Sequence, residues 1–324
     1  MGLTCIICGG EKRKPQFRSN GYVIVRCRNC HFRFVDPTPA ASELAQFYNQ
    51  AYAVDLRNYS EHMDDQRLRE LERFHPPGRL LEIGASYGHW LNLARARGWT
   101  AAGIEVSREA ARYAREYFGL DVQNADLIAA QVEDASCDAV VMWHVLEHVS
   151  NPAEQLRRVR EILRPGGVVA IRVPNGASLG AIVGRQWWFW MSPPAHLWFF
   201  SPVTLSNFLA QHGFEVVHIG TMRGDGLDPY QHLARAATGE LASLARTLRR
   251  RAGGIEHSWR DTPGVSKDVS LTRHSPPARA RRTEVLERFG PVALHLDKAT
   301  SRLTRRLEQS GFGDELVGYA RRPA

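Results

Sequence analysis

Two histidines and a glutamate fall within five positions of the stretch MWHVLEHVSNP, residues 142–152. His144, Glu147 and His148 follow the apolar run AVVM, which is typical of a buried strand. A neutral imidazole at the end of a strand can accept a proton from a hydroxyl group, which is general base catalysis. These residue types could therefore perform acid/base chemistry, although for His148 alone packing beneath a sheet is the simpler interpretation.

Four of the five cysteines form two short pairs, CIIC and CRNC. This spacing suits one Zn²⁺ held by four thiolates, because each pair closes one tight turn and the segment between the pairs returns as a hairpin. A disulfide is the weaker interpretation, because a reducing cytoplasm disfavours it. We expect a zinc ribbon over residues 1–36, which depends on metal because so short a segment cannot bury a core of its own. The expected ligands are Cys5, Cys8, Cys27 and Cys30.

The elements that position these residues begin at residue 79, where strand and helix patterns alternate. The short apolar runs are RLLEIG, TAAGIEV, LDVQNA, CDAVVMWH and GVVAIRV, and helical stretches such as HWLNLARARG and PAEQLRRVREILRPG lie between them. Strands separated in this way predict a mostly parallel sheet covered on both faces, with ligands at the carboxyl ends of its strands. Cys137 begins one of the runs, and we expect it to be a small buried residue.

The first of these strands ends in a glycine-containing loop, EIGASYG. Gly84 and Gly88 let the backbone turn tightly and approach a ligand. Glu105 ends the second strand, where a carboxylate can accept hydrogen bonds from ribose hydroxyls, and Asp126 follows the third strand, where it suits an adenine amino group. Glu82 would repel phosphate and favour a cationic amino-acid group. The pattern therefore favours S-adenosylmethionine over a dinucleotide.

Residues 79–220 resemble class I S-adenosylmethionine-dependent methyltransferases. The matching stretches are LLEIGASYG, the carboxylate after the second strand, NADL, HVLEHV and LRPGG. In that family the end of the fourth strand borders the transferable methyl group, which implies that His144 faces the acceptor. The residues expected to bind the cofactor are Glu82, Gly84, Ala85, Gly88, Glu105, Asp126, Leu127 and Trp143.

The resemblance leaves two kinds of catalysis open. In the favoured one, His144 and His196 perform acid/base chemistry on a hydroxyl acceptor. In the less favoured one a catalytic divalent metal binds here, since small-RNA 2′-O-methyltransferases and ubiquinone-pathway O-methyltransferases carry a similar metal-holding E-x-x-E-H cluster. Here the first position is histidine, which weakens affinity for hard Mg²⁺. The expected catalytic residues are His144, Glu147, His148 and His196.

The alternating pattern and the resemblance together imply an α/β protein with a Rossmann-like, seven-strand, mostly parallel sheet, and the resemblance implies that its last strand is antiparallel. The resemblance implies that ELVGYARR is this last strand and inserts between the fifth and sixth. The expected parts are the zinc ribbon (1–36), a helical connector over the cofactor (37–78), the methyltransferase domain (79–220 plus 314–324) and a basic helical insertion (221–313). The insertion holds 17 basic and 10 acidic side chains, nearly the whole formal charge of +8.

The stretch RQWWFWMSPPAHLWFF, residues 185–200, carries aromatic faces that suit sugar rings or planar acceptors. A zinc ribbon followed by FRFVDPTP resembles bacterial methyltransferases of sugar, polysaccharide or natural-product biosynthesis, which implies O-methylation of a small-molecule or glycan hydroxyl. Arginine clusters in the ribbon and the insertion leave an RNA methyltransferase as the alternative.

A third alternative is a non-catalytic scaffold subunit. In that case an apolar side of the predicted helix 283–309 would pair with a protein partner or a second copy of the chain. The sequence has no apolar run of membrane-spanning length and no export signal at its N-terminus, which predicts a cytoplasmic protein.

Overall fold

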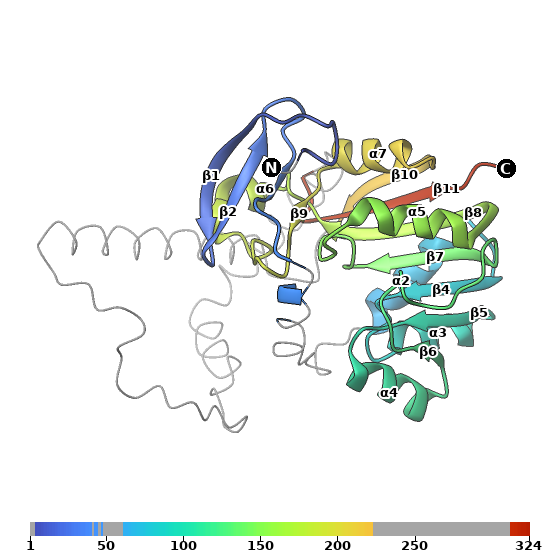
Figure 1. Ribbon diagram of the computed structural model, residues 1–324. Coiled ribbons are helices and arrows are strands. Elements are labelled where there is room, and N and C mark those ends of the chain that lie inside the picture. The colour runs from blue at the N-terminus through green and yellow to red at the C-terminus, as the bar shows by residue number, and fades with distance from the viewer. Residues whose placement is uncertain (1–3, 41, 45–46, 48–60, 223–311) are drawn as a thin grey trace, which may run out of the picture.

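The computed structural model describes residues 4–40, 42–44, 47, 61–222 and 312–324, which form two sheets (Figure 1). The predicted basic insertion, with its helix 283–309, lies outside the described residues, apart from its first two and last two positions. The central part of the predicted connector, residues 48–60, lies outside them as well.

The larger sheet has seven strands in the order β10-β11-β8-β7-β4-β5-β6. Its strands are β4 (Arg79–Ile83), β5 (Thr100–Ile104), β6 (Asp121–Gln123), β7 (Cys137–Trp143), β8 (Leu163–Pro174), β10 (Glu215–Met222) and β11 (Glu315–Arg321). The pairs from β6 across to β8 are parallel, whereas β11 runs antiparallel to both β8 and β10. This arrangement confirms the predicted fold class, including the insertion of the last strand between its two neighbours.

Helices cover both faces of the larger sheet. They are α2 (Glu61–Glu72), α3 (His89–Ala96), α4 (Arg108–Phe118), α5 (Pro152–Ile162) and α7 (Pro202–Gln211). Helix α6 (Leu179–Gly184) and a 3₁₀ turn, η2 (Arg185–Trp187), follow β8. Leu81 and Val140 pack with residues of α5 and α7, whereas their neighbours Leu80 and Val141 pack with residues of α2, α3 and α4. This alternation is the period of two that a pleated strand imposes. None of the helices in the described part of the chain is long and apolar enough to cross a bilayer.

Side-chain caps fix where the helices beside the site begin. Asn151 accepts a hydrogen bond from the backbone N–H of Glu154 and precedes Pro152, the first residue of α5. Glu147 and His148 do not belong to this helix, because they lie in a separate turn between β7 and α5. This turn places both side chains near His144 at the end of β7.

The smaller sheet has the order β1-β2-β3-β9. Its strands are β1 (Arg13–Ser19), β2 (Tyr22–Cys27), β3 (Arg33–Val35) and β9 (Trp198–Phe199). The first three belong to the predicted ribbon, and the fourth comes from the aromatic segment that follows His196. Figure 1 shows these N-terminal strands beside α6 and β9, at the opposite end of the molecule from β6 and α4.

Candidate active site

The loop after β4 is built by glycines in the left-handed region. Gly84 has φ of 74° and Gly88 has φ of 81°. A Cβ added at Gly84 would lie 2.6 Å from Cγ2 of Val145, and one added at Gly88 would lie 2.7 Å from Cδ1 of Leu120. Both positions therefore require glycine for conformation and for space. The loop is also tied to β5, because the backbone N–H of Gly84 donates to the carbonyl of Ile104 at 2.8 Å.

Glu105 joins the two strand ends at this edge of the sheet. The carboxylate is buried and accepts hydrogen bonds from the backbone N–H of Ser86 at 2.8 Å and of Ser107 at 2.7 Å. Burial raises its pKa, while these backbone donors oppose the rise. Each carboxylate oxygen has two lone pairs, so Glu105 keeps acceptor capacity for a ligand that lies against the loop.

The other predicted cofactor residues lie around this edge. Glu82 and Ala85 are buried in and after β4, and Leu127 is buried after β6. The carboxylate of Asp126 accepts hydrogen bonds from the backbone N–H groups of Ile128 and Ala129 at 2.8 and 2.9 Å, so it shapes the turn that follows β6. Trp143 ends β7 and packs edge-on against Trp90. The carboxyl ends of β4, β5, β6 and β7 thus carry all eight predicted residues.

His144 lies between two buried carboxylates. Its Nδ1 is 3.2 Å from Oε1 of Glu147, and its Nε2 is 3.3 Å from Oε2 of Glu315. Burial lowers the pKa of His144, but the charges of Glu315 and Glu147 outweigh it and raise the pKa to about 9. Its backbone has φ of 54°, which is uncommon outside glycine and is found at constrained sites. The imidazolium form, with both N–H groups directed at carboxylates, is therefore the stable one.

Glu315 and Arg172 are site residues that sequence reasoning missed. Glu315 begins β11, its carboxylate pairs with the guanidinium of Arg172 on β8, and both side chains are almost fully buried. Burial opposes ionisation of Glu315, but His144 and Arg172 lower its pKa to about 2. The antiparallel pairing of β8 with β11 brings these residues together. An acidic residue opening a C-terminal strand is the only signal for them in the sequence.

A second cluster forms where Glu147, His148 and His196 meet. One ligand atom from each lies within 4.8 Å of the others. Nδ1 of His148 donates to the carbonyl of Ala195 at 2.8 Å, and Nδ1 of His196 donates to the carbonyl of Trp190 at 2.6 Å, so Nε2 is the nitrogen of each ring that is left to face the cluster. Burial, followed by the charge of His148, lowers the pKa of His196 to about 4. The ring of His196 is therefore a neutral base at pH 7.

The ring of Trp190 contacts both His144 of the first cluster (His144, Glu147 and Glu315) and His196 of the second. Its ring stacks on His144 at a centroid distance of 5.2 Å and on His196 at 5.7 Å. The predicted aromatic segment thus reaches the strand end, and it does so through this indole in particular. The structure brings all four predicted catalytic residues together, with His144 in the first cluster, His148 and His196 in the second, and Glu147 shared by both.

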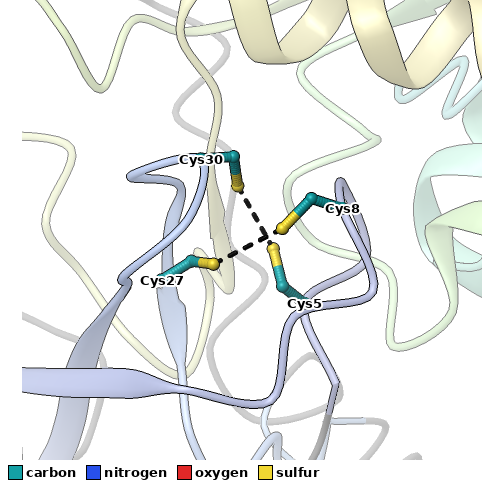
Figure 2. Close-up of side chains that lie close together, drawn as sticks. All are labelled: Cys5, Cys8, Cys27 and Cys30. Carbon is teal, nitrogen blue, oxygen red and sulfur yellow. Dashed lines mark hydrogen bonds between the residues drawn. The ribbon is translucent and has the colours of Figure 1, made fainter.

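The four predicted metal-binding cysteines converge on one point (Figure 2). Their sulfur atoms approach in crossed pairs, with Cys5 and Cys30 at 3.5 Å and Cys8 and Cys27 at 3.5 Å. A tetrahedral zinc with Zn–S bonds of 2.3 Å separates its sulfurs by about 3.8 Å, so this donor set fits the ion. Although burial opposes it, backbone N–H groups of Cys30 and Asn29 lower the pKa of Cys27 to about 7, which favours a thiolate. Cys137 lies apart from the cluster and is buried, as predicted.

Comparison with known proteins agrees with this geometry. The chain is 28% identical over 152 residues to a probable S-adenosylmethionine-dependent methyltransferase of Mycolicibacterium smegmatis, covering 46% of this chain and 56% of that one. It is 32% identical over 144 residues to a ubiquinone biosynthesis O-methyltransferase of Caulobacter vibrioides, covering 40% and 57%. The aligned parts are less than two thirds of either relative.

Solved structures share the fold at lower identity. The 4+2 cyclase SpnF matches with a TM-score of 0.50 and 17% identity, over 89% of this chain and 98% of that one. A likeness at that identity shows the fold alone, since one fold can support different reactions. The family described as "Methyltransferase domain" matches residues 55–219, about half of the chain. With the predicted strand order and the Gly84–Glu105 edge in place, this match shows that the chain belongs to the class I S-adenosylmethionine-dependent methyltransferase family.

Proposed function

We propose that the protein transfers the methyl group of S-adenosylmethionine to a hydroxyl oxygen of a sugar, glycan or natural-product acceptor, with His196 as the proton acceptor. One observation carries the assignment to oxygen: a buried, neutral imidazole presents Nε2 beside the end of β7 while its Nδ1–H is held by the carbonyl of Trp190. A hydroxyl must lose its proton as it attacks, and a fixed neutral imidazole can accept it. An amine that is already neutral can attack the methyl group without losing a proton first, so it has less need of such a base.

The cofactor brings an activated methyl group, and the protein supplies alignment. Gly84 and Gly88 leave room for a ligand close to the backbone, and Glu105 offers acceptors for ribose hydroxyls. The geometry of the strand ends supports binding on the β4–β5 side and chemistry on the β7 side.

We assign His144 a positioning role instead of the general base role that the sequence indicates. Both of its ring nitrogens face carboxylates, and its imidazolium form is stabilised at neutral pH. A protonated ring cannot accept a substrate proton. His144 instead holds Oε1 of Glu147 and the plane of Trp190 in place, so that the second cluster keeps its geometry.

The acceptor class is supported by the aromatic segment of residues 185–200. Trp190 presents an indole next to both histidines, and planar or sugar acceptors suit such a surface. Relatives named as ubiquinone biosynthesis O-methyltransferases also methylate oxygen. The resemblance of the N-terminal sequence to sugar and polysaccharide methyltransferases favours a sugar or glycan over a quinol.

A divalent metal in the second cluster is the other candidate for activating the hydroxyl. Oε2 of Glu147 is buried and has no hydrogen-bond partner in the part of the chain that the structure describes. Nε2 of His148 and Nε2 of His196 converge on the same space, and the Nδ1 atoms of both rings are anchored on backbone carbonyls, as is usual for metal-binding histidines. A bound metal would lower the pKa of the acceptor hydroxyl.

We also propose that the four-cysteine cluster holds a structural zinc ion, as its donor set suggests. The metal content of the protein separates the two candidates for hydroxyl activation. Wild type with one equivalent of zinc per chain supports His196 as the base. A second equivalent that is lost in Glu147→Gln but kept in Cys27→Ser supports the metal site.

Two other functions are less well supported. An RNA acceptor would use basic side chains of the ribbon such as Lys12, Arg18 and Arg28, which are exposed on the surface. A non-catalytic scaffold would not need the left-handed Gly84 and the anchored Glu105, so the intact cofactor edge argues against it.

Methyl transfer tests the proposal. Purified protein is incubated with S-adenosylmethionine labelled in its methyl group and with sugars, nucleotide sugars, glycans, phenols and RNA. His196→Gln should lower transfer about 10²-fold or more. The matched control is His212→Gln, because Nδ1 of His212 also bonds a backbone carbonyl but the residue caps the C-terminus of α7 and is not part of the cluster. Equal loss in both variants, or transfer to RNA alone, would contradict the proposal.

A further inference from the structure

The four-cysteine segment, residues 4–36, shares a sheet with β9, which lies in the aromatic segment 185–200 on the acceptor side of the site. Strand β3 pairs with β9, with Arg33 opposite Phe199 and Phe34 opposite Trp198. The carbonyl of Leu197 accepts from the backbone N–H of Val35 at 2.9 Å, and the N–H of Leu197 donates to the carbonyl of Glu147 at 2.8 Å. One residue after His196, the backbone thus connects the N-terminal segment directly to the catalytic turn.

A buried aromatic stack strengthens this connection. Phe32 lies 5.8 Å from Phe34 and 5.2 Å from Phe200 between ring centroids, and Phe34 stacks on Trp198 at 6.1 Å. The indole N–H of Trp198 donates to the carbonyl of Val149 at 2.7 Å, at the end of the turn that carries His148. These rings are almost fully buried, so separating them would expose a large apolar area to water.

The tip of the β1–β2 hairpin contacts the middle of the aromatic segment 185–200. The hydroxyl of Ser19 donates to the carbonyl of Met191 at 3.2 Å, and the amide of Asn20 donates to the carbonyl of Pro193 at 2.9 Å. These two carbonyls lie between Trp190 and His196. The hairpin therefore contacts the segment between Trp190 and His196, and β3 contacts it immediately after His196.

We propose that the four-cysteine segment is a positioning element for the acceptor side of the active site, and that its metal occupancy controls the order of residues 187–199. This inference rests on the proposed function, in which His196 and the zinc ion have the roles given above. The second cysteine pair leads directly into the contact surface, because the backbone N–H of Cys27 donates to the carbonyl of Phe32. So short a segment depends on its metal to keep its fold.

The cofactor edge should respond differently. The hydrogen bonds that shape it run between the β4 and β5 loops, through Gly84, Glu105 and Ser107. Metal removal should therefore increase hydrogen exchange in residues 187–199, whereas S-adenosylhomocysteine should still bind. Zinc occupancy would then affect acceptor binding without affecting cofactor binding.

Hydrogen–deuterium exchange of the full-length protein tests the inference without an identified acceptor. The samples are zinc-loaded wild type, wild type after chelation, and the double variant Ser19→Ala/Asn20→Gly, which keeps all four cysteines. Glycine keeps the left-handed backbone of position 20, where φ is 46°, and removes only the side chain. The matched control is Gln16→Ala, because among the described residues the Gln16 side chain bonds only within its own strand.

Chelation and the double variant should each raise exchange in peptides covering 187–199 by roughly tenfold, the effect expected from losing two hydrogen bonds. Peptides covering β4 and β5, and the affinity for S-adenosylhomocysteine by calorimetry, should stay within about twofold of wild type, as should every measurement on Gln16→Ala. Unchanged exchange in 187–199 in both samples would overturn the inference. So would an equal rise across β4 and β5, because the metal would then stabilise the whole fold. Absence of S-adenosylhomocysteine binding in zinc-loaded wild type would instead count against the proposed function.

Discussion

Replacing Glu315 with glutamine should strongly destabilise the protein. The carboxylate is 0% exposed, pairs with Arg172, which is also 0% exposed, and lies 3.3 Å from Nε2 of His144. Removing one partner of a buried pair typically costs about 3–5 kcal/mol, because the remaining charge keeps its desolvation penalty. Glu315→Gln should therefore lower the free energy of unfolding by about 3–5 kcal/mol in a urea titration at pH 7.

The pH dependence has a defined sign. The pKa of Glu315 is lowered from 4.5 to about 2, so its contribution to stability is fully present above pH 4.5 and is lost as the pH falls through 2. The difference between wild type and variant should persist from pH 7 to 5 and shrink below that window. The double variant Arg172→Met/Glu315→Leu should lose less free energy of unfolding than Glu315→Gln does, because it removes both charges of the pair.

Glu215→Gln is the matched control, because Glu215 begins the neighbouring strand β10 and is exposed. A surface change of this kind should alter stability by less than about 0.5 kcal/mol. If Glu315→Gln fell within about 1 kcal/mol of wild type, the inferred buried charge network around His144 would be refuted.

Three further predictions concern the cofactor loop, the metal and the base. Gly84→Ala should weaken S-adenosylhomocysteine binding about tenfold or more in calorimetry, since its Cβ would lie 2.6 Å from Val145; unchanged affinity would contradict the loop geometry. Cys27→Ser should lower bound zinc measured by mass spectrometry, whereas Cys137→Ser should retain it; equal zinc in both would count against the four-cysteine site. The pKa of His196 is lowered to about 4, so the rate of methyl transfer should show no inflection from His196 between pH 5 and 8. If the rate fell below pH 6.5 in wild type but not in His196→Gln, this prediction would be wrong.

Local sequence patterns predicted most of the larger sheet and the cysteine cluster. Apolar runs and glycines mark β4, β5 and β7 directly, and the CIIC and CRNC spacing brings four thiols to one point in the structure. The position of β11 came from resemblance to a known fold, and the register confirms it.

Contacts between distant parts of the chain could not be predicted. The Arg172–Glu315 pair depends on the register of an antiparallel strand pair and leaves no periodic signal in the sequence. Strand β9 has two residues, too few for a recognisable pattern, yet it joins the ribbon to the acceptor segment. The role of His144 depends on these contacts, because Glu315 reaches it only through β11.

Cofactor binding at the Gly84–Glu105 edge is the claim on which the other proposals depend. The most direct test is calorimetric titration of S-adenosylmethionine and S-adenosylhomocysteine into wild type and Glu105→Ala, with bound zinc measured in the same samples. Wild type should bind both ligands and Glu105→Ala should lose most of that affinity while keeping its zinc, because Glu105 organises both strand ends. A folded, zinc-loaded wild type that binds neither ligand, or a variant that binds as tightly as wild type, would contradict the account.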